Sequence, residues 1–540
     1  MKHFKEFNIF LIIFLFVQQI NSQVNQEWAA RYNGTSDYSD FPKKIIADRF
    51  GNIYVGGYST QNNTSQDYTV IKYNSEGIQQ WISFFNGNAS GPDYGNSISI
   101  DSFGNVYITG RSLFSGYDIA TVKFDQNGTQ LWSAIYNGPF NGGDWGNSVS
   151  VDGFGNVYIT GYSLTSANNI DYITIKYNSS GVQQWVRIYN GSGNAYDEAK
   201  IVLTDAAGNV YVTGWSFGNG TNYDYCTIKY NTLGSQQWIA RYNNSYNGID
   251  EANSMVVDNN GNVYVTGVSQ GNGTNYDFAT VKYNSSGISQ WVTRFNGSGN
   301  FIDRANSLKI DNLGNVFVTG NSSGVSLKSD YVTIKYNNQG AQQWSAIYNG
   351  PANDADVPLD VLLDNLGNVY VTGYSYNTST DEDITTLKYN NNGIQQWVSR
   401  YDYSLNDEGV SITIDNLNNI YVCGNSGPGL NADFVTIKYS QSIGIQILSS
   451  EIPESYSLSQ NYPNPFNPVT KIQFALPKNA FVKFTVYDAL GKEVEIMVQE
   501  ELNAGKYEVD WNADSYPSGV YYYNISAGEY NVTKKMVLIK

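Results

Sequence analysis

The chain has 540 residues, which is longer than one ordinary domain. Of these, 41% are hydrophobic and only 15% are charged, a composition that argues against an intrinsically disordered protein. Its formal net charge of −17 argues against nucleic-acid binding and against docking on anionic membranes, because both need a basic surface. The 45 Tyr, 11 Trp and 52 Gly are typical of many short strands joined by tight turns, so we expect an all-β protein.

The first 22 residues have the pattern of a secretory signal peptide. Lys2, His3 and Lys5 form a basic start, and residues 9–17 form an apolar run too short to span a bilayer. Cleavage is expected before Gln23. We therefore predict export across the inner membrane, no transmembrane segment, and a mature protein without histidine, since His3 is the only one.

A repeat of about fifty residues follows, and three markers each occur eight times. The first marker is a tryptophan, at Trp28, Trp81, Trp132, Trp185, Trp238, Trp291, Trp344 and Trp397. The second is the turn Asp-x-x-Gly-Asn, whose aspartates are Asp48, Asp101, Asp152, Asp205, Asp258, Asp311, Asp364 and Asp415, with Asn418 in place of glycine in the last copy. The third begins at Asp67, Asp118, Asp171, Asp224, Asp277, Asp330, Asp383 and Asp433. Such periodicity predicts a closed repeat architecture.

Each repeat is expected to form four strands, a to d. In the second repeat these are residues 96–100, 106–110, 119–124 and 129–136, separated by glycine-containing turns. About fifty residues and four strands are typical of one blade of a β-propeller. The eighth repeat lacks strand d, and an unassigned segment around Trp28 precedes the first strand a. Residues 23–440 are therefore predicted to form an eight-bladed β-propeller whose N-terminal strand completes the last blade, which removes free sheet edges.

The repeat unit resembles a known bacterial family. Asp-x-x-Gly-Asn-Val-Tyr-Val-Thr-Gly, Asp-Tyr-x-Thr-Ile-Lys-Tyr and Gln-Gln-Trp together are similar to the bacterial β-propeller repeat called SBBP, over residues 24–440. The resemblance implies the propeller fold and leaves the activity open, because propellers have many functions.

After a linker at residues 441–455, residues 456–540 are predicted to form a small immunoglobulin-like β-sandwich with strands near 470–476, 481–487, 505–511 and 519–527. This segment resembles the type A C-terminal sorting domain of the type IX secretion system of Bacteroidota. The residues that carry the resemblance include Asn461, Pro463, Pro465, Phe466, Gly491, Gly519, Lys534, Lys535 and Lys540. It implies that the type IX machinery is a partner, that export follows Sec-dependent passage through the periplasm, and that the product is released or attached to the cell surface.

Aspartates in the d–a loops are the weak candidates for a metal site: Asp40, Asp93, Asp144, Asp197, Asp250, Asp303, Asp356 and Asp407. A ring of carboxylates could bind Ca²⁺ through oxygen ligands. The alternative is structural, with each carboxylate capping turn amides, because a residue repeated in every blade usually supports the fold. A lysine in every strand c, such as Lys123, is expected to pair with the turn aspartates. The sequence indicates no other cofactor.

No catalytic residue is assigned. Without histidine, Ser-His-Asp, Cys-His and histidine-based zinc chemistry are absent from the mature chain. Cys226 and Cys423 are expected to be buried and unpaired. The leading hypothesis is a non-enzymatic, secreted or cell-surface propeller that binds a protein or glycan. The alternatives are a carboxylate-dependent enzyme acting on extracellular polysaccharide and a structural surface component.

Overall fold

The computed structural model describes residues 24–540 apart from 37, 62–64, 88–90, 115, 168, 325–327, 379–380, 404–405, 428–430, 442–444, 450–451 and 514–515. The predicted signal peptide lies outside the described residues. All assigned secondary structure in the described part of the chain is β, as predicted. Within that part, no helix is long and apolar enough to cross a lipid bilayer.

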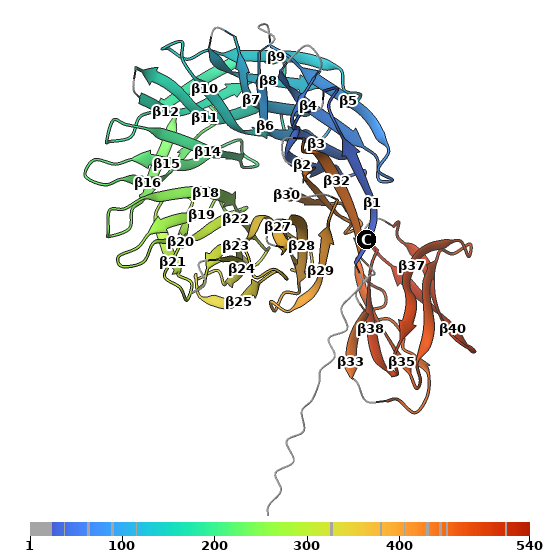
Figure 1. Cartoon of the computed structure of the whole chain (residues 1–540). Coiled ribbons are helices and arrows are strands. Elements are labelled where there is room, and N and C mark those ends of the chain that lie inside the picture. The colour runs from blue at the N-terminus through green and yellow to red at the C-terminus, as the bar shows by residue number, and fades with distance from the viewer. Residues whose placement is uncertain are drawn as a thin grey trace, which may run out of the picture.

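Residues up to 441 form a ring of four-stranded sheets around a central axis (Figure 1). Each sheet is an antiparallel meander, and we number the sheets as blades in chain order. The strands of the first four blades, each in the order a to d, are β2 (Phe41–Ala47), β3 (Ile53–Thr60), β4 (Gln66–Tyr73) and β5 (Gln79–Phe85); β6 (Asp93–Ile100), β7 (Val106–Leu113), β8 (Tyr117–Phe124) and β9 (Gln130–Tyr136); β10 (Asp144–Val151), β11 (Val157–Ser166), β12 (Asn169–Tyr177) and β13 (Gln183–Tyr189); and β14 (Asp197–Thr204), β15 (Val210–Phe217), β16 (Tyr223–Tyr230) and β17 (Gln236–Tyr242).

The second half of the ring repeats the same meander. Its strands are β18 (Asp250–Val257), β19 (Val263–Gln270), β20 (Tyr276–Tyr283) and β21 (Ser289–Phe295); β22 (Asp303–Ile310), β23 (Val316–Ser323), β24 (Ser329–Tyr336) and β25 (Gln342–Tyr348); β26 (Asp356–Leu363), β27 (Val369–Thr378), β28 (Asp381–Tyr389) and β29 (Gln395–Tyr401); and β30 (Asp407–Ile414), β31 (Ile420–Ser426) and β32 (Asp433–Gln441). The eighth sheet is completed by β1 (Val24–Tyr32), which gives the strand order β1-β32-β31-β30.

The ring is closed by the N-terminal strand, as predicted. β1 pairs antiparallel with β32, with Trp28 opposite Lys438 and Tyr32 opposite Phe434. Every strand a contacts the strand a of both neighbouring blades, including β2 with β30 across the closure. The strands a therefore lie innermost, around the axis of the ring, and the strands d lie at the periphery (Figure 1). The propeller fold predicted from the repeats is confirmed.

The two ends of the ring differ in their connections. The a–b and c–d turns lie at one end, here called the turn end, and the longer b–c and d–a loops lie at the other, the loop end. At the turn end Asp101 caps a typical turn, because its Oδ1 accepts hydrogen bonds from the amides of Phe103 and Asn105 at 2.9 and 3.0 Å. Gly104 adopts a φ of 80°, which glycine accommodates without strain.

The repeated tryptophan joins adjacent blades at the turn end. Trp132 of blade 2 donates its indole N–H to the carbonyl of Ser179 in blade 3 at 3.1 Å. Its ring packs between Tyr107 of its own blade and Tyr177 of the next, with centroids 6.1 and 6.3 Å away. Each aromatic pair of this kind contributes about 0.5–1.5 kcal/mol beyond the area it buries. The tryptophan series therefore holds the ring together.

The lysine of strand c does not form the expected ion pair with the turn aspartates. Lys123 Nζ lies 5.0 Å from the ring centroid of Tyr107 and donates to the carbonyl of Ser179 at 3.5 Å. The turn carboxylate is already occupied, because Asp101 accepts from the Asn105 amide group and from the Tyr107 hydroxyl at 2.7 and 2.9 Å. A cation–π contact at a blade interface replaces the predicted pair.

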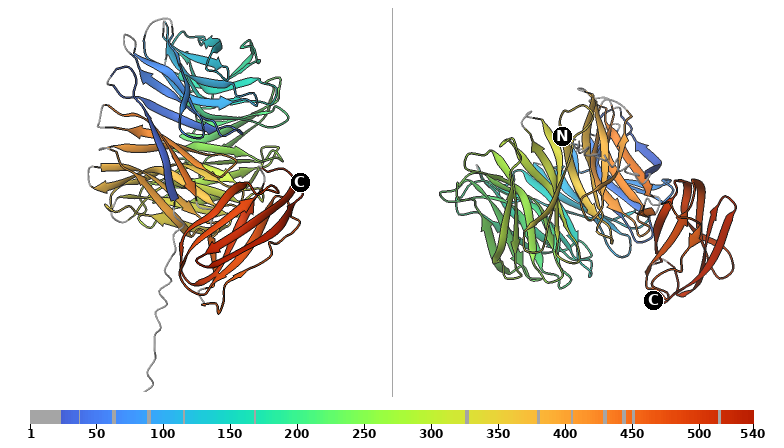
Figure 2. Two further views of the ribbon diagram at one scale, coloured as in Figure 1. Left: turned by 90° about the vertical axis from the view of Figure 1, so that its right-hand side faces the viewer. Right: turned by 90° about the horizontal axis from the view of Figure 1, so that it is seen from below.

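Residues from 445 onward form a separate β-sandwich (Figures 1 and 2). One sheet has the order β33-β38-β35-β34 and the other the order β37-β36-β39-β40. The strands are β33 (Ile445–Ser449), β34 (Ser457–Leu458), β35 (Val469–Leu476), β36 (Ala480–Tyr487), β37 (Glu493–Leu502), β38 (Gly505–Asn512), β39 (Gly519–Ala527) and β40 (Tyr530–Leu538). The segment expected to be a linker contains a strand, β33, whose backbone pairs with the edge of β38. The sandwich therefore begins before the predicted boundary at residue 456.

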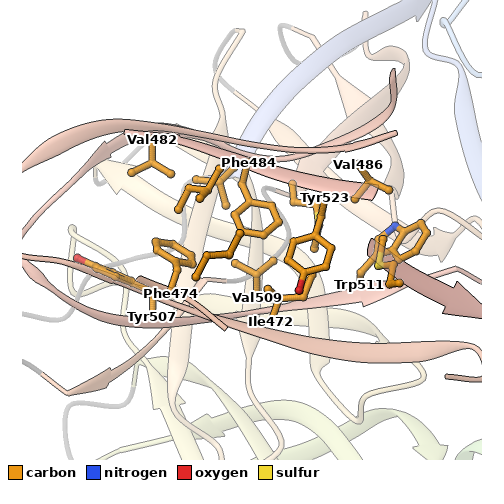
Figure 3. Close-up of a cluster of buried hydrophobic side chains, with 14 of the residues drawn as sticks. Ile472, Phe474, Val482, Phe484, Val486, Tyr507, Val509, Trp511 and Tyr523 are labelled. Carbon is orange, nitrogen blue, oxygen red and sulfur yellow. The ribbon is translucent and has the colours of Figure 1, made fainter. Parts of the chain in front are cut away.

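The sandwich core lies between its two sheets (Figure 3). Phe474 stacks on Tyr507 within one sheet at 5.2 Å, and Phe484 stacks on Tyr523 within the other at 5.9 Å. Trp511 is fully buried at one end of this core. The immunoglobulin-like assignment stays a prediction, whereas the two-sheet sandwich is present.

Candidate functional site

The eight aspartates predicted as weak metal candidates are buried residues at the starts of the strands a, and each is at most 1% exposed: Asp40, Asp93, Asp144, Asp197, Asp250, Asp303, Asp356 and Asp407. The series is not uniform, because Oδ1 of Asp250 and of Asp356 is buried without a hydrogen-bond partner among the described residues. Asp197 has both oxygens occupied: its Oδ2 accepts from the amide of Gly191 at 2.5 Å and its Oδ1 from the amide of Phe217 at 2.9 Å. It therefore ties the d–a loop to the end of strand b, which is the structural role that we weighed against metal binding.

Burial raises the pKa of Asp40 and of Asp250 to about 6, although backbone or side-chain hydrogen bonds oppose the shift. None of the eight belongs to a group of three close metal-ligating side chains. Among the described residues, the one such group consists of Asp381, Asp383 and Asp402, with carboxylate oxygens within 4.8 Å of one another. Calcium binding by the series stays a hypothesis beside the structural role.

The second aspartate series, at the start of strand c, is held by arginine in four blades. In each, an arginine of strand d reaches the aspartate: Arg31–Asp433 at 3.0 Å, Arg241–Asp224 at 2.8 Å, Arg294–Asp277 at 2.7 Å and Arg400–Asp383 at 3.3 Å. Arg241 also donates to Ser216 Oγ at 2.8 Å and to the Tyr189 hydroxyl of the preceding blade at 3.2 Å. These guanidinium groups have protein partners on several sides and act as inter-blade links.

In the other four blades an apolar residue takes the place of this arginine: Phe84, Ile135, Ile188 and Ile347. Asp118 of blade 2 then lies buried beside Ile135 without a cation. Burial, with a smaller contribution from the charge of Asp144, raises the pKa of Asp118 to about 6. The blades are therefore of two kinds, four with this arginine and four with an apolar residue in its place.

The strongest variation among blades occurs at the second residue of strand a and at its partner in strand b. These pairs lie at the loop end of the two inner strands of each blade, around the axis of the ring, and we call this region the mouth of the ring. In chain order they are Phe41–Tyr58, Tyr94–Arg111, Trp145–Tyr162, Glu198–Trp215, Glu251–Val268, Arg304–Asn321, Val357–Tyr374 and Glu408–Asn425. The residues before them are constant aspartates. A constant frame therefore presents a variable set of side chains at the mouth of the ring.

Blades 1 to 3 place a continuous group of aromatic rings at this mouth, which we call the aromatic cluster: Phe41, Tyr58, Tyr94, Arg111, Tyr117, Trp145 and Tyr162. All seven side chains are half-buried. Ring contacts cross the blade boundary between Tyr58 and Tyr94, whose centroids are 4.9 Å apart, and Trp145 stacks on Tyr162 at 5.3 Å. Burial raises the pKa of Tyr58 to about 12, so its hydroxyl is a neutral donor at physiological pH.

Arg111 lies in the middle of the aromatic cluster. Its guanidinium carbon is 3.3 Å from the ring centroid of Trp145, 4.3 Å from that of Tyr94 and 4.8 Å from that of Tyr117. Its Nε is buried without a hydrogen-bond partner, and no ion pair of Arg111 is found in the described part of the chain. This arrangement differs from that of Arg241, which has three kinds of protein acceptor.

Acidic side chains lie at the mouth in the adjacent blades 4 and 5, at Glu198 and Glu251, and in blade 8, at Glu408. Glu198 accepts from Lys200 Nζ at 2.5 Å and from the Asn147 amide group at 3.0 Å. Burial raises the pKa of Glu408, while the Asn425 amide group stabilises its charged form. Acidic side chains therefore lie on both sides of the aromatic cluster along the ring.

Neither the aromatic cluster nor the glutamates at the mouth were predicted as site residues from the sequence. A signal was available, because Tyr94, Trp145 and Glu198 directly follow constant aspartates yet differ from blade to blade. The pairing of Tyr94 with Arg111 depends on a register with a shift between Gly95 and Ser97, which the sequence does not reveal. The contacts between residues of different blades, such as Tyr58 with Tyr94, can be identified only from the structure.

The residues assigned to the sorting signal form two groups in the sandwich. Asn461 is buried and donates to Thr470 Oγ1 at 2.9 Å and to the carbonyl of Pro463 at 3.0 Å, and Phe466 packs on Trp511 at 5.5 Å. Pro465, like Pro463, follows a cis peptide bond. Lys534 and Lys535 lie on β40 opposite Tyr523 and Tyr522, and Lys535 and Lys540 are exposed. Gly491 occupies a turn with φ of 80°, and Gly519 begins β39.

Comparison with known families supports both parts. Residues 460–540 match the secretion system C-terminal sorting domain, and residues 27–63, 80–118, 131–166, 237–274 and 290–327 match the beta-propeller repeat SBBP. The two resemblances noted in the sequence are therefore confirmed. A sorting domain of this kind indicates secretion to the cell surface and interaction with the secretion machinery.

An uncharacterized WD repeat-containing protein of Acanthamoeba polyphaga mimivirus is 30% identical over 155 residues, which cover 23% of this chain and 11% of that protein. The match thus spans about a tenth of that relative. Among solved structures, PorZ, a surface component of the type IX secretion system of Porphyromonas gingivalis, is 13% identical with a TM-score of 0.32, covering 92% of this chain and 74% of PorZ. The β-propeller domain of a Pyrococcus furiosus protease is 8% identical with a TM-score of 0.37, covering 64% of this chain and 96% of that domain.

Proposed function

We propose that this secreted propeller is a non-enzymatic binding protein, and that its ligand is an extracellular glycan held at the aromatic cluster. In this proposal the type IX machinery exports the chain through its C-terminal domain after Sec-dependent passage through the periplasm. The propeller then presents its loop end to the surroundings of the cell.

The observation that carries the proposal is the series of contacting, partly exposed aromatic rings that crosses three blades at the mouth of the ring. Tyr58, Tyr94, Tyr117 and Trp145 are linked by ring contacts of 4.9, 6.3 and 6.5 Å. Ligand sites combine aromatic surface with a few placed polar groups, and tyrosine and tryptophan supply both an apolar face and a polar tip. The apolar C–H face of a sugar ring can pack on such surfaces, and its hydroxyls can bond to the phenol groups.

The variability of these positions among blades supports a binding role for the mouth. Elsewhere the repeat uses its aromatic residues between blades, as with Trp132, whose indole N–H already has a carbonyl partner. The rings of the aromatic cluster occupy positions that the frame does not require, because other blades have Glu251 or Val357 at the equivalent place. Residues free of a structural requirement are available for recognition.

The test is a glycan array probed with the mature chain and with Trp145→Ala and Tyr94→Ala. We expect specific binding by the unsubstituted protein and a loss of about tenfold or more in affinity in each variant, because truncation of central aromatic anchors has effects of this size. The matched control is Phe103→Ala, which removes a ring that is 79% exposed at the opposite end of blade 2.

Binding that is lost in both cluster variants and kept in Phe103→Ala supports the proposal. Binding that survives both cluster variants would place the ligand elsewhere on the molecule. A chain that binds no glycan, and whose variants melt at the temperature of the unsubstituted protein, would contradict glycan binding and favour a protein ligand or a structural surface role.

A further inference from the structure

We infer that Arg111 receives a single acidic group of the ligand, a uronate carboxylate or a sugar sulfate, so that the glycan is an acidic one with isolated charges. This inference rests on the proposed function and names the ligand class of the same site. Its basis is the chemistry of one guanidinium group at the mouth.

The surroundings of Arg111 hold its plane and leave its hydrogen-bonding capacity unused. Three rings lie within 4.8 Å of the guanidinium carbon, which fixes the group by cation–π contacts. The guanidinium group offers five N–H donors. The faces of the aromatic rings attract its charge but do not accept conventional hydrogen bonds from these donors, as the oxygens of a carboxylate do. Its buried Nε has no partner among the described residues.

The surroundings of Arg111 differ from those of the arginines that link neighbouring blades. Where arginine links blades, as at Arg241, Arg294 and Arg400, it bonds to an aspartate, to a serine and to a tyrosine hydroxyl of the preceding blade. Arg111 lies in strand b, opposite Tyr94, where the other blades have no arginine. A planar, oriented fork without an acceptor matches the geometry of a carboxylate or sulfate.

The charge of the rest of the molecule limits the number of acidic groups. The chain has a formal net charge of −17, and Glu198, Glu251 and Glu408 lie at the same mouth. A polyanion that extends across this mouth would be repelled by these groups. One acidic group beside neutral sugars can contact Arg111 while the neutral residues stack on the rings or bond to the glutamates.

The experiment uses matched pairs of oligosaccharides with the mature, full-length chain. Each uronate oligosaccharide is measured beside its carboxyl-reduced form, and each sulfated one beside its desulfated form, with polygalacturonate oligomers as the polyanion. We expect the singly acidic member to bind about tenfold or more tightly than its neutral partner, and more tightly than the polyanion of equal length.

Arg111→Gln should remove this preference, so that the acidic partner and its neutral partner bind that variant with affinities within about threefold of each other. Arg111→Lys, which keeps the charge without the fork, should keep part of the preference and guards against a folding defect in the first variant. The matched control is Arg304→Gln, because Arg304 is exposed at the mouth in blade 6, outside the aromatic cluster. The control should retain the full preference.

Equal binding of acidic and neutral partners would overturn the inference and leave the proposed function standing. A preference that persists in Arg111→Gln, with an unchanged melting temperature, would overturn the assignment to Arg111. Absence of binding to every glycan would contradict the proposed function itself, and the inference with it. A preference for sulfate over carboxylate, or the reverse, identifies the source of the acidic group.

Discussion

The two ends of the propeller have the same strands and very different side chains. At the turn end, Asp101 and its counterparts repeat the same capped turn, and Trp132 and its counterparts repeat the same ring contacts at the blade interfaces. At the loop end, the constant aspartates such as Asp197 are followed by Phe, Tyr, Trp, Glu, Arg or Val. The comparison teaches that the turn end repeats one set of contacts, whereas the loop end keeps its aspartates and varies the residues beside them. Under the proposed function, these variable residues would recognise the ligand.

The largest effect should come from filling the space under a turn-end glycine. Gly181 has φ of 80°, and a Cβ there would lie 2.7 Å from the ring of Trp132. Gly220, in a loop-end connection, has φ of 81° and nothing within 4 Å of a Cβ. Gly220→Ala should cost about 1–2 kcal/mol of unfolding free energy, from backbone strain alone. Gly181→Ala should cost about 2 kcal/mol more, because it also displaces the tryptophan.

Urea denaturation followed by tryptophan fluorescence and circular dichroism checks this pair of variants. Since both glycines have the same backbone conformation, the difference between them isolates the packing contribution. Equal destabilisation by the two substitutions would contradict the claim that structural constraint is concentrated at the turn end.

Acidification should stabilise the propeller, because it protonates buried loop-end carboxylates. The folded-state pKa of Asp118 is about 6, above its ordinary value of 3.8, and Asp40 and Asp250 are shifted in the same way. A group with a raised folded-state pKa contributes stability that is complete below about pH 4 and is lost as pH rises through about 6. We expect the unfolding free energy to increase by about 2 kcal/mol from pH 7.5 to pH 5, measured by urea denaturation.

The opposite trend over this interval would show that these carboxylates are stabilised as anions. The lowered pKa of Asp205 does not interfere, because its stabilising contribution is lost only on acidification below about pH 4.

A smaller gain is expected from giving blade 2 the arginine that other blades have. Ile135 is 40% exposed at the position held by Arg241 in blade 4, and Asp118 lies beside it without a cation. Ile135→Arg should raise the unfolding free energy at pH 7.5 by about 1 kcal/mol through a partly buried ion pair. Ile135→Gln serves as the uncharged control. A gain in both variants would assign the effect to removal of exposed apolar surface rather than to the ion pair.

The same variant should flatten the pH dependence described above, since a paired Asp118 stays charged at lower pH. If Ile135→Arg raised stability equally at pH 5 and pH 7.5, the two blade types would differ for a reason other than the charge of Asp118.

The smallest effect is expected from calcium. Both oxygens of Asp40 and of Asp197 already accept hydrogen bonds from backbone amides, so these members of the series offer little to a cation. Calorimetry of the mature chain should show no set of eight equivalent sites, and chelator should shift the melting temperature by less than about 1 °C. Binding with a stoichiometry near eight would contradict this. A single site would instead be located with Asp402→Asn, since Asp402 belongs to the one carboxylate group found among the described residues.

The fold was predictable because its signals are local and repeated. Periodic tryptophans, glycine turns and the unassigned segment around Trp28 were enough to predict the blades and their closure. Strand limits were less accurate: strand a of blade 2 begins at Asp93 and strand b ends at Leu113, each three residues beyond the predicted limit at the loop end. These extensions depend on Asp93 and its neighbours bonding across loops, which spacing alone does not show.

The candidate site was less predictable because it consists of departures from the pattern. Tyr94, Arg111 and Trp145 lie far apart in sequence and meet only because adjacent blades pack in one register. In the C-terminal sandwich, β37 was missed for a related reason, since Glu493–Leu502 mixes glutamates with apolar residues across two bulges. In both cases, tertiary contacts rather than local propensity determine the structure.

The pairing of β1 with β32 also determines when the ring can be completed. A chain synthesised from its N-terminus contains β1 long before residues 433–441 exist, so the first strand has no partner until the last blade has been made. Closure therefore comes late, and until then an incomplete chain keeps open sheet edges at its two ends, which can pair with other chains. Once closed, blade 8 contains both the first strand of the ring and the strand that leads into the sandwich, so one sheet joins the beginning of the propeller to its export domain.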